Sequence, residues 1–365
     1  MTGGAEPTVD RLRLAAQLLS GPPARTPQDV VERLLAVQAQ ELRGARLAVR
    51  SRSTGLHVSD VDRALADRSL VVSWLCRGTL HLVRASDLHW LHALVTPGLQ
   101  STSARRLAQE GVPPDDADRG VEAVRRALAA HGPLPRAQLR EQVAAAGVRV
   151  AGQALVHVLL QAELRGICVR GPVVDGEQAH VLRDDWLGPP PPHLDRDAAL
   201  ARLAARYLSG HGPATDRDLA RWSGLPLRDA RRGLSGAGAR QRGDGLAELP
   251  GGTDAPLPPP RLLGPFDPLL LGWTSRQPVV GDADAGVVTS NGVFRPVALV
   301  QGRAVATWGL AAGRVTVRPF TDVAPADLAA LHADADAVLR FLAPRPPERG
   351  ALRHTAADLE DGSTA

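Results

Sequence analysis

Two glutamines one residue apart, Gln38 and Gln40, are the residues whose type and spacing best suit chemistry in this chain. They close an apolar run in the segment Val37-Gln38-Ala39-Gln40-Glu41. A glutamine amide is not a general base at neutral pH, but it donates and accepts hydrogen bonds from fixed positions. Two such amides can hold a water molecule against a bond that is already primed to break. We therefore take Gln38 and Gln40 as candidate catalytic residues for a hydrolysis, and interpret Glu41 as a solvated acid at a helix end.

The spacing of the pair sets a condition on the backbone. Thr26 as a cap, Pro27 at the first helical position and Asp29 in the first turn predict a helix that runs to about Ala39. Residues two apart on an α-helix point roughly 200° away from each other, so they cannot share one water. The helix must therefore end or loosen at the glutamines, and Gly44 favours such an end.

The chain contains no lysine, so its 43 basic residues are all arginines, against 39 acidic residues. A Schiff-base enzyme needs an amine nucleophile, and the terminal amine of Met1 is the only one this sequence offers, so lyase or aldolase chemistry through a lysine is excluded. Abundant Ala, Gly and Pro indicate that a GC-rich genome accounts for part of the arginine content. A sequence pI of about 10.1 and the bidentate geometry of guanidinium groups also suit phosphate, so nucleic acid is a candidate partner.

The length of 365 residues indicates roughly two to four structural units. Long apolar runs and a basic-then-apolar leader are lacking, so we expect a cytoplasmic protein without a membrane partner. Cys76 and Cys168 lack the clustered spacing of a zinc site or a disulfide framework and are expected to be buried thiols. His89 and His92 share a helix face without clustered ligands nearby, so no metal or other cofactor is predicted.

A short internal repeat marks two similar units. The sequence Ala130-His131-Gly132-Pro133-Leu134 recurs 80 positions later as Gly210-His211-Gly212-Pro213-Ala214, and each copy leads into a helix. After the second copy, Thr215 caps a helix with Asp218 at its third position, and a glycine turn leads to a second helix, as in a helix-turn-helix. The first copy precedes two helices and two short strands, which predicts the wing of a winged helix. These elements are expected over 136–145, 152–164, 167–170 and 180–182, and over 218–222 and 226–234.

The first 110 residues follow a similar plan. Alternating residues over 71–74 and 80–83, with Gly78 between them, predict another small wing. Downstream of Arg261 the chain is strand-rich and ends in a helix over 327–342, as expected for a small barrel. The predicted fold class is α+β, mainly α, with tandem winged-helix (helix-turn-helix) units followed by a C-terminal small β-barrel domain. The barrel strands are expected within 279–280, 286–288, 293–301, 304–308 and 314–319.

Proline-rich linkers at 189–192 and 256–260 help to place the boundaries of these units. Recognition helices with wings read duplex DNA, so three such units favour a DNA-binding protein. The predicted units are a first winged helix with the glutamine pair (1–115), a second (116–190), a third (194–252), the barrel domain (260–345) and a flexible tail (346–365).

Four separated motifs strengthen this interpretation. They are Val37-Gln38-Ala39-Gln40, Trp74-Leu75-Cys76-Arg77-Gly78-Thr79-Leu80-His81-Leu82-Val83, Phe266-Asp267-Pro268-Leu269-Leu270-Leu271-Gly272 and Asn291-Gly292-Val293-Phe294-Arg295-Pro296. In this order they resemble the winged-helix DNA glycosylases of the AlkZ and YcaQ type, over nearly the whole chain. The glutamine pair matches the Gln-x-Gln form of the AlkZ branch rather than the Gln-x-Asp form of the YcaQ branch.

The resemblance implies that Gln38 and Gln40 position the water in a DNA glycosylase. It further implies hydrolysis of the N-glycosidic bond of N7-alkylated guanine, including the unhooking of interstrand crosslinks made by DNA-alkylating natural products. Alkylation at N7 makes guanine cationic and a good leaving group, so a neutral amide pair suffices to orient water at an oxocarbenium-like sugar. The implied partner is double-stranded DNA that carries alkylated guanine.

Several polar residues are candidate DNA contacts. Arg77, Thr79 and His81 belong to the first wing and are expected to meet phosphate or the lesion strand. Phe266 and Asp267 are expected to hold a turn. Arg276, Asn291 and Arg295 of the barrel are expected to grip the DNA backbone, where contacts fix register rather than sequence.

A non-catalytic winged-helix DNA-binding protein or regulator remains the alternative. Such a protein needs neither amide for binding, whereas a glycosylase would keep binding and lose turnover without them. Aromatic residues make up only 3% of the chain, which disfavours a pocket that stacks a flipped base and favours attack with the adduct left in the duplex. No heptad pattern is present, so a monomer is expected.

Overall fold

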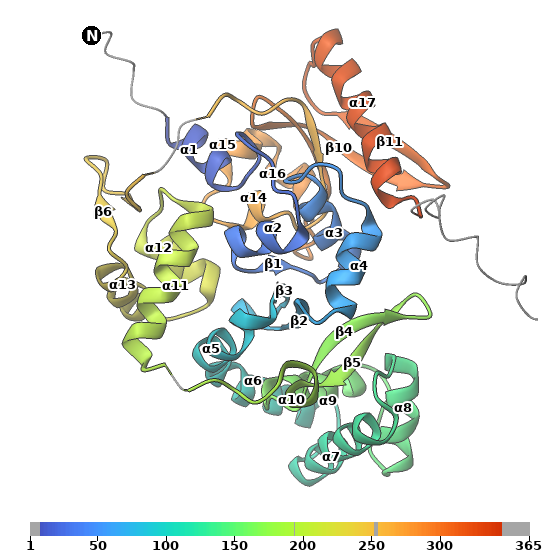
Figure 1. Cartoon of the computed structure of the whole chain (residues 1–365). Helices are drawn as coiled ribbons and strands as arrows, with labels where there is room; N and C mark the ends of the chain where they lie inside the picture. The colour runs from blue at the N-terminus through green and yellow to red at the C-terminus, as the bar shows by residue number, and fades with distance from the viewer. Residues whose placement is uncertain (1–7, 193, 252–254, 345–365) are drawn as a thin grey trace, which may run out of the picture.

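The computed structural model describes residues 8–192, 194–251 and 255–344, which form two antiparallel sheets, a small ribbon and the helices around them (Figure 1). The predicted tail over 346–365 lies outside the described residues. The first helices of the chain are α1 (Val9–Ala16), α2 (Pro27–Leu34), α3 (Leu42–Arg50), α4 (Val58–Ala66), α5 (Ala85–Val95) and α6 (Pro97–Gln109). They are followed by α7 (Pro114–His131), α8 (Arg136–Ala145), α9 (Ala154–Leu164) and α10 (Arg183–Leu187).

A five-stranded antiparallel sheet lies at the middle of the molecule, in the strand order β1-β3-β2-β4-β5. Its strands are β1 (Val37–Gln38), β2 (Leu70–Trp74), β3 (Leu80–Arg84), β4 (Cys168–Val174) and β5 (Glu177–Leu182). The two hairpins predicted over 71–83 and 167–182 are confirmed as β2–β3 and β4–β5. They pair with each other at Val72 and Arg170, so one sheet joins the first two predicted units.

The predicted third unit contains α11 (Arg196–His211), α12 (Asp216–Ser223), α13 (Leu227–Gly236) and the ribbon β6 (Arg240–Gln241) with β7 (Ala247–Glu248). Thr215 and Asp218 form the expected reciprocal cap, with the Thr215 hydroxyl bound to the Asp218 amide at 3.1 Å. Gly224 ends α12 at φ 79°, a conformation that glycine adopts without strain. The predicted helix, glycine turn and second helix are therefore confirmed here.

A second sheet with the strand order β11-β10-β9-β8 occupies the C-terminal region beside α17 (Pro325–Leu342). Its strands are β8 (Arg261–Leu263), β9 (Val297–Val300), β10 (Arg303–Ala311) and β11 (Arg314–Pro319). The four strands make an open sheet, so the described residues do not confirm the predicted barrel. Short helices α14 (Pro268–Leu271), α15 (Gln277–Val280) and α16 (Asp284–Val287) lie between β8 and β9.

The strands predicted at 279–280 and 286–288 are wrong, because α15 occupies the first and α16 ends at Val287, leaving only Val288 in an isolated bridge to Phe294. Pro278 stands in the first turn of α15, where proline is well tolerated. Each short helix buries one valine, Val280 or Val287. Two adjacent apolar residues fit a helical turn as well as a strand, so periodicity could not separate the two.

The described residues form three apolar cores, and two of them join parts of the chain that are far apart in the sequence. One core is confined to residues 107–168, which belong to the second predicted unit and the last residues of the first. A second core joins α2–α4 and the central sheet to the C-terminal sheet and α17. The largest core joins α1, the region around α5, the helices α11–α13 and the segments near α14. Residues far apart in the sequence therefore share a core around β1, and the exact unit boundaries stay predictions.

Cys76 and Cys168 are buried free thiols, as expected. The part of the chain that the structure describes holds no group of three or more His, Cys, Asp or Glu side chains arranged for a metal ion. The Nε2 atom of His92 lies 3.0 Å from the carbonyl oxygen of Glu163. Within the described ranges, no helix combines the length and the apolar character needed to cross a bilayer.

Burial of two histidines predicts a loss of stability in acid. His211 stacks on Tyr207 with ring centroids 4.8 Å apart, and burial lowers the pKa of His211 and of His81 to about 3. The unfolded chain protonates both below about pH 6.5, whereas the native state stays neutral, so stability is complete above that pH and declines toward pH 3. Between pH 7 and pH 5 we expect a loss of about 2 kcal/mol per histidine, measured by urea unfolding.

The variant His211→Gln provides the control, because it lacks one of the two titrating groups. Its stability should fall less than that of the wild type over the same pH interval, by about 2 kcal/mol. Parallel pH curves for the two proteins would contradict the assignment.

Candidate active site

The backbone around the glutamine pair is extended rather than helical. Helix α2 ends at Leu34, and Leu35 follows with φ 64°, which turns the chain out of the helix. Val37 and Gln38 then pair with β3, and the Ala39 amide donates to the Leu80 carbonyl at 2.7 Å. The predicted helix to Ala39 was therefore too long. The helix ends before the glutamines, as the spacing requires, with Gln38 in β1 and Gln40 in the bend that follows the strand.

Gly44, expected to help end the helix, lies inside α3 instead. A Cβ atom added there would lie 2.7 Å from the carbonyl oxygen of Pro265. Likewise, a Cβ atom on Gly264 would lie 2.8 Å from the Leu47 Cβ atom. The two glycines therefore allow α3, which follows the glutamines, to contact the segment that leads to Phe266.

Each glutamine presents its carbonyl oxygen to a donor of the protein. Gln38 Oε1 accepts from Arg77 Nη2 at 3.2 Å, and Gln40 Oε1 accepts from the Leu80 backbone amide at 3.2 Å. Both partners are obligate donors, so the assignment of oxygen and nitrogen in each amide is unambiguous. Each oxygen keeps a second lone pair, and each NH₂ group carries two donors. Gln38 is 8% exposed, whereas Gln40 is exposed.

His81 faces Gln38 directly across the β1–β3 ladder. Its Nδ1 atom lies 2.9 Å from the Thr79 carbonyl oxygen, which can only accept, so Nδ1 carries the proton. Burial and the nearby Arg77 charge lower the pKa of His81 to about 3. The imidazole is therefore neutral at physiological pH. Thr79 Oγ1 donates to the Cys76 carbonyl at 3.1 Å.

Arg77 occupies the short turn η1 (Cys76–Gly78) between β2 and β3, with φ 57°. Besides Gln38, its guanidinium donates to the backbone carbonyl of Trp222 at the end of α12. Burial lowers the pKa of Arg77 from its ordinary value. A non-glycine residue held at positive φ at a candidate site is a feature that function often maintains.

A cavity of about 210 Å³ opens beside Gln38. Three regions distant in sequence form it: the β1–β3 region, the third unit and the C-terminal segments. Gln38, Arg77 and Thr79 contribute the polar wall, and Arg221 and Arg276 add two more guanidinium groups. The remaining lining residues are Phe266, Leu270, Leu271, Trp273, Gly292 and Phe294.

The aromatic content of the chain is low, but three aromatic side chains, Phe266, Trp273 and Phe294, line this cavity. The rings of Phe266 and Phe294 lie 5.9 Å apart, and the guanidinium of Arg276 lies over the Phe294 ring at 5.2 Å. The cavity therefore offers apolar rings and three arginines, and no carboxylate of the described residues lines it. Asp267 caps α14 and pairs with Arg52, so the predicted turn role is confirmed for Asp267, while Phe266 also lines the cavity.

The structure brings together four of the predicted site residues on the cavity wall: Gln38, Arg77, Thr79 and Arg276. His81 lies behind that wall. Asn291 and Arg295 are exposed and flank the lining residues Gly292 and Phe294, and Arg295 Nη1 donates to the Gly286 carbonyl at 3.3 Å. Four further lining residues were not predicted from the sequence, although two of them lie inside the Phe266–Gly272 motif: Arg221, Leu270, Leu271 and Trp273.

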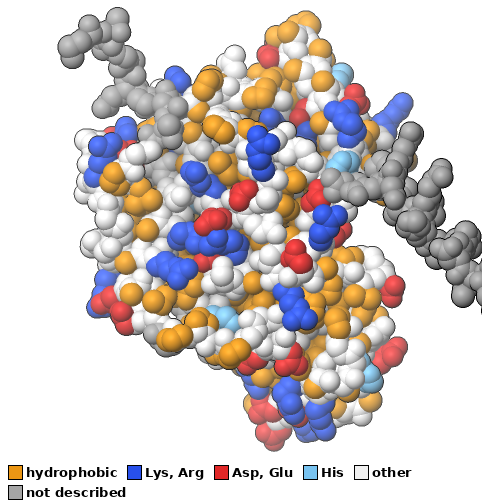
Figure 2. All heavy atoms as spheres, in the orientation of Figure 1, with side chains coloured by type: hydrophobic (Ala, Val, Ile, Leu, Met, Phe, Trp, Pro, Cys, Tyr) orange, Lys and Arg blue, Asp and Glu red, His pale blue; other side chains and the backbone are white. Residues whose placement is uncertain are grey.

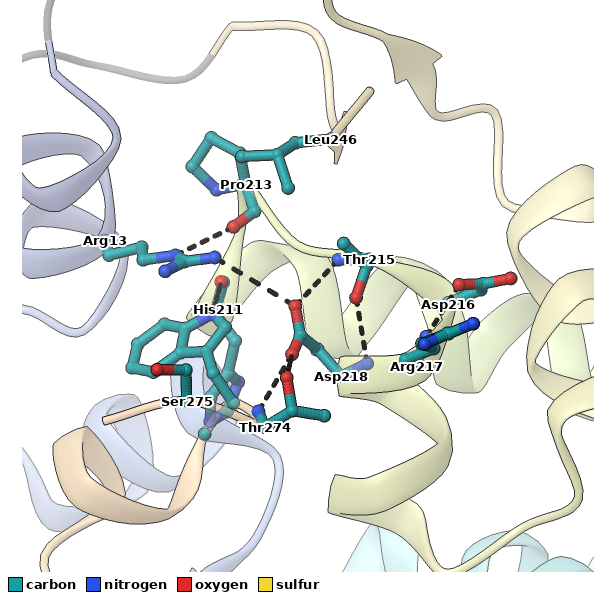
Figure 3. Close-up of polar contacts among 12 residues, drawn as sticks. Arg13, His211, Pro213, Thr215, Asp216, Arg217, Asp218, Leu246, Thr274 and Ser275 are labelled. Atoms are coloured by element: carbon teal, nitrogen blue, oxygen red, sulfur yellow. Dashed lines mark hydrogen bonds and ion pairs between the residues drawn. The ribbon is translucent and has the colours of Figure 1, made fainter. Parts of the chain in front are cut away.

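Asp218 of the third unit binds Thr274, which lies between the cavity residues Trp273 and Arg276. Its carboxylate accepts from the Thr274 amide at 2.8 Å and the Thr274 hydroxyl at 2.7 Å, while also accepting from the Thr215 amide at 2.9 Å (Figure 3). Burial raises the pKa of Asp218, but the hydrogen bonds from Thr274 and Thr215 outweigh it and keep the pKa below the ordinary value. Arg13 of α1 donates to the Pro213 carbonyl at 2.9 Å and stacks on Trp273 at 4.8 Å.

The close approach at Gly44 gives a test of this packing. We expect Gly44→Ala to destabilise the fold by about 1–3 kcal/mol, because the added methyl group collides with a backbone oxygen. Gly98→Ala in α6 is the control, since its Cβ would meet nothing within 4 Å. That change should be neutral or slightly stabilising. Equal unfolding midpoints for the two variants in urea would argue against the predicted contact.

Comparison with known proteins identifies the family. A family model described as DNA glycosylase AlkZ-like matches residues 31–341. The chain belongs to the AlkZ-like DNA glycosylase family. It is 29% identical to an interstrand DNA cross-link repair glycosylase of Streptomyces sahachiroi over 356 residues, which cover 90% of this chain and 94% of the relative. The solved structure of Streptomyces sahachiroi DNA glycosylase AlkZ matches with a TM-score of 0.73 and 26% identity, over 91% of this chain and 95% of that one.

Membership of the AlkZ-like family confirms the predicted resemblance and makes the protein a DNA glycosylase. The mixed α/β architecture agrees with that of the Streptomyces sahachiroi structure over most of both chains. Family membership gives the class of reaction, whereas the roles of single residues depend on the geometry described above.

Proposed function

We propose that this glycosylase hydrolyses the N-glycosidic bond of N7-alkylated guanine in duplex DNA and unhooks interstrand crosslinks, in DNA repair or self-resistance to genotoxic natural products. The observation that carries the proposal is the pair of glutamine amides in the non-helical segment after α2, where Gln38 lines a cavity that also contains three arginines. The Streptomyces sahachiroi relative, named as an interstrand cross-link repair glycosylase, supports the crosslink substrate.

In the proposed reaction, Gln38 and Gln40 orient one water molecule below C1′ of the damaged nucleotide. The water oxygen bonds to C1′ as the bond from C1′ to the base nitrogen breaks, and the bonding pair neutralises the cationic guanine ring. The water then releases one proton to solvent. Because the base leaves as a neutral molecule, two uncharged amides that hold the water supply sufficient assistance.

Because the sequence contains no lysine, we expect the DNA strand to stay intact after the base is released. A bifunctional glycosylase forms a Schiff base with an amine and then cleaves the strand, and here no lysine can supply that amine. We therefore propose a monofunctional enzyme that leaves an intact abasic site and needs no cofactor.

We propose that tandem winged-helix units hold the DNA. In the first 110 residues, α2, β1, α3, α4 and the β2–β3 hairpin follow one another between α1 and α5–α6, and the second and third units each combine helices with a hairpin or ribbon. Backbone contacts are assigned to Thr79 at the cavity and to the C-terminal residues Arg276, Asn291 and Arg295. Arg77 and His81, also expected to contact DNA, are assigned to the support of Gln38. Arg77 is half-buried and donates to Gln38, and His81 is only 1% exposed.

The distribution of surface charge indicates which part of the protein binds DNA. Figure 2 shows basic side chains, all of them arginines in this chain, interleaved with carboxylates across the face in view. That face therefore has no uninterrupted basic patch, and the basic lining of the cavity is the better candidate for DNA contact. We propose that the protein acts as a cytoplasmic monomer on nucleoid DNA, since the glutamines and the cavity lie within one chain.

The test uses purified protein and two duplexes, one with a site-specific N7-alkylguanine and one with an interstrand crosslink between two guanine N7 atoms. We expect release of free alkylguanine, detected by mass spectrometry, and strands that break only after alkali. A duplex with the same alkyl group at guanine O6 is the matched control, because that base is neutral and should stay attached. Binding without release from either N7 substrate would instead favour a non-catalytic DNA-binding protein.

A further inference from the structure

Arg77 lies where the third unit meets the glutamine pair. Its Nη2 atom donates to Gln38 Oε1 at 3.2 Å, and its Nη1 atom donates to the carbonyl of Trp222 in the last turn of α12. One guanidinium group therefore bridges the glutamine amide in β1 and the backbone of a helix that begins 178 positions after Gln38.

The backbone of Arg77 is in equally close contact with the third unit. A Cβ atom added to Gly224, in the turn between α12 and α13, would lie 2.9 Å from the Arg77 nitrogen and 3.2 Å from its Cα atom. Gly224 also has φ 79°. No other residue type fits this position without moving the turn away from Arg77.

The surroundings of Arg77 orient the amide of Gln38. No carboxylate among the described residues forms an ion pair with Arg77, and its charge faces the carbonyl groups of Gln38 and Trp222. A fixed cation beside the amide holds Oε1 toward Arg77 and turns the NH₂ group away from it. Without that cation, both orientations of the amide become accessible.

We propose that Arg77 is a positioning residue that fixes the Gln38 amide and makes its orientation depend on the docking of α12. This inference rests on the proposed role of Gln38 in the glycosylase reaction. It differs from the expectation that Arg77 contacts phosphate, because the relevant partners of Arg77 lie inside the protein. The glutamine site is complete only when the third unit is docked, which couples DNA binding by that unit to catalysis.

The experiment measures single-turnover base release and DNA affinity over a range of salt concentrations for Arg77→Ala, Arg77→Lys and Gly224→Ala. We expect Arg77→Ala to slow release about tenfold or more at saturating enzyme, with Kd and its salt dependence unchanged. Arg77→Lys should recover part of the rate, and Gly224→Ala should slow release although it retains both Arg77 and Gln38. Arg217→Ala is the control for loss of charge, because Arg217 is an exposed arginine in α12.

A phosphate contact gives the opposite pattern. Removal of one such contact weakens binding and reduces the salt slope of log K by about 0.9, while the rate at saturation stays at the wild-type value. That result for Arg77→Ala would overturn the proposal.

A second readout does not depend on activity. In protein labelled with ¹⁵N-glutamine, the side-chain NH₂ resonances of Gln38 are identified by their loss in Gln38→Ala. Arg77→Lys and Gly224→Ala should shift these resonances, whereas Arg217→Ala should leave them in place. Unshifted resonances in well-folded variants would refute the positioning role. A wild type that releases no base would refute the proposed function and leave this second readout to decide the role of Arg77.

Discussion

Replacement of both Gln38 and Gln40 by alanine is expected to slow base release by about 100-fold or more while the DNA affinity stays within about threefold. The amides act on the water at the moment of bond cleavage, so their loss raises the barrier to reaction rather than the energy of binding. Gln38 is only 8% exposed and offers DNA little surface. The measurement is single-turnover release of N7-alkylguanine at saturating enzyme, with Kd determined separately by titration.

The single alanine variants, and a control variant at another glutamine, test whether the slower base release comes from loss of the two amides. If the two amides hold one water together, Gln38→Ala and Gln40→Ala should each cost nearly as much as the double change. Gln28→Ala is the control, because Gln28 lies on the preceding helix α2 and donates to Ser69 at 2.8 Å. Wild-type rates in the double variant would place the catalytic water elsewhere, with Glu41 as the first alternative.

Local signals in the sequence predicted much of the secondary structure. The cap at Thr215, the glycine turn at Gly224 and the hairpins over 71–83 and 167–182 each depend on neighbouring residues, and the structure confirms them. Helix α17 begins two residues before its predicted start and ends at Leu342 as expected. Such elements are specified by hydrogen bonds and side-chain periods within a few residues, which a sequence displays directly.

The site itself depends on contacts that local patterns do not contain. Helix α2 ends four residues before Gln38, and the segment that follows becomes a strand only because β3 is there to pair with it. Likewise, Arg221 and Trp273 line the cavity through the docking of α12 on the turn at Arg77 and of the Thr274 loop on Asp218. The motifs identified the residues, whereas only the packed chain shows which of them meet.

Removal of the Asp267 carboxylate is expected to destabilise the protein by about 3–5 kcal/mol. Asp267 and Arg52 form an ion pair at 2.7 Å in which both side chains are 0% exposed. Asp267→Ala would leave the Arg52 charge buried without its counter-ion, which costs far more than the net value of the pair. The same carboxylate caps α14 through the Leu269 amide at 2.9 Å, so the cavity wall should loosen as well. Urea unfolding at pH 7 measures the change.

Two other ion pairs, formed by arginines of α3, test whether burial causes the large loss of stability expected for Asp267→Ala. Asp334 pairs with Arg50, and their side chains are 14% and 9% exposed. Asp62 pairs with Arg46, and their side chains are 32% and 18% exposed. Because solvent compensates a charge that it can reach, Asp62→Ala should cost at most about 1 kcal/mol, and Asp334→Ala should fall between the two. Asp267→Asn keeps an oxygen that can cap α14 and accept from Arg52, so it should cost less than Asp267→Ala. An equal loss for Asp62→Ala and Asp267→Ala would mean that burial does not set the cost, since these two pairs differ most in exposure.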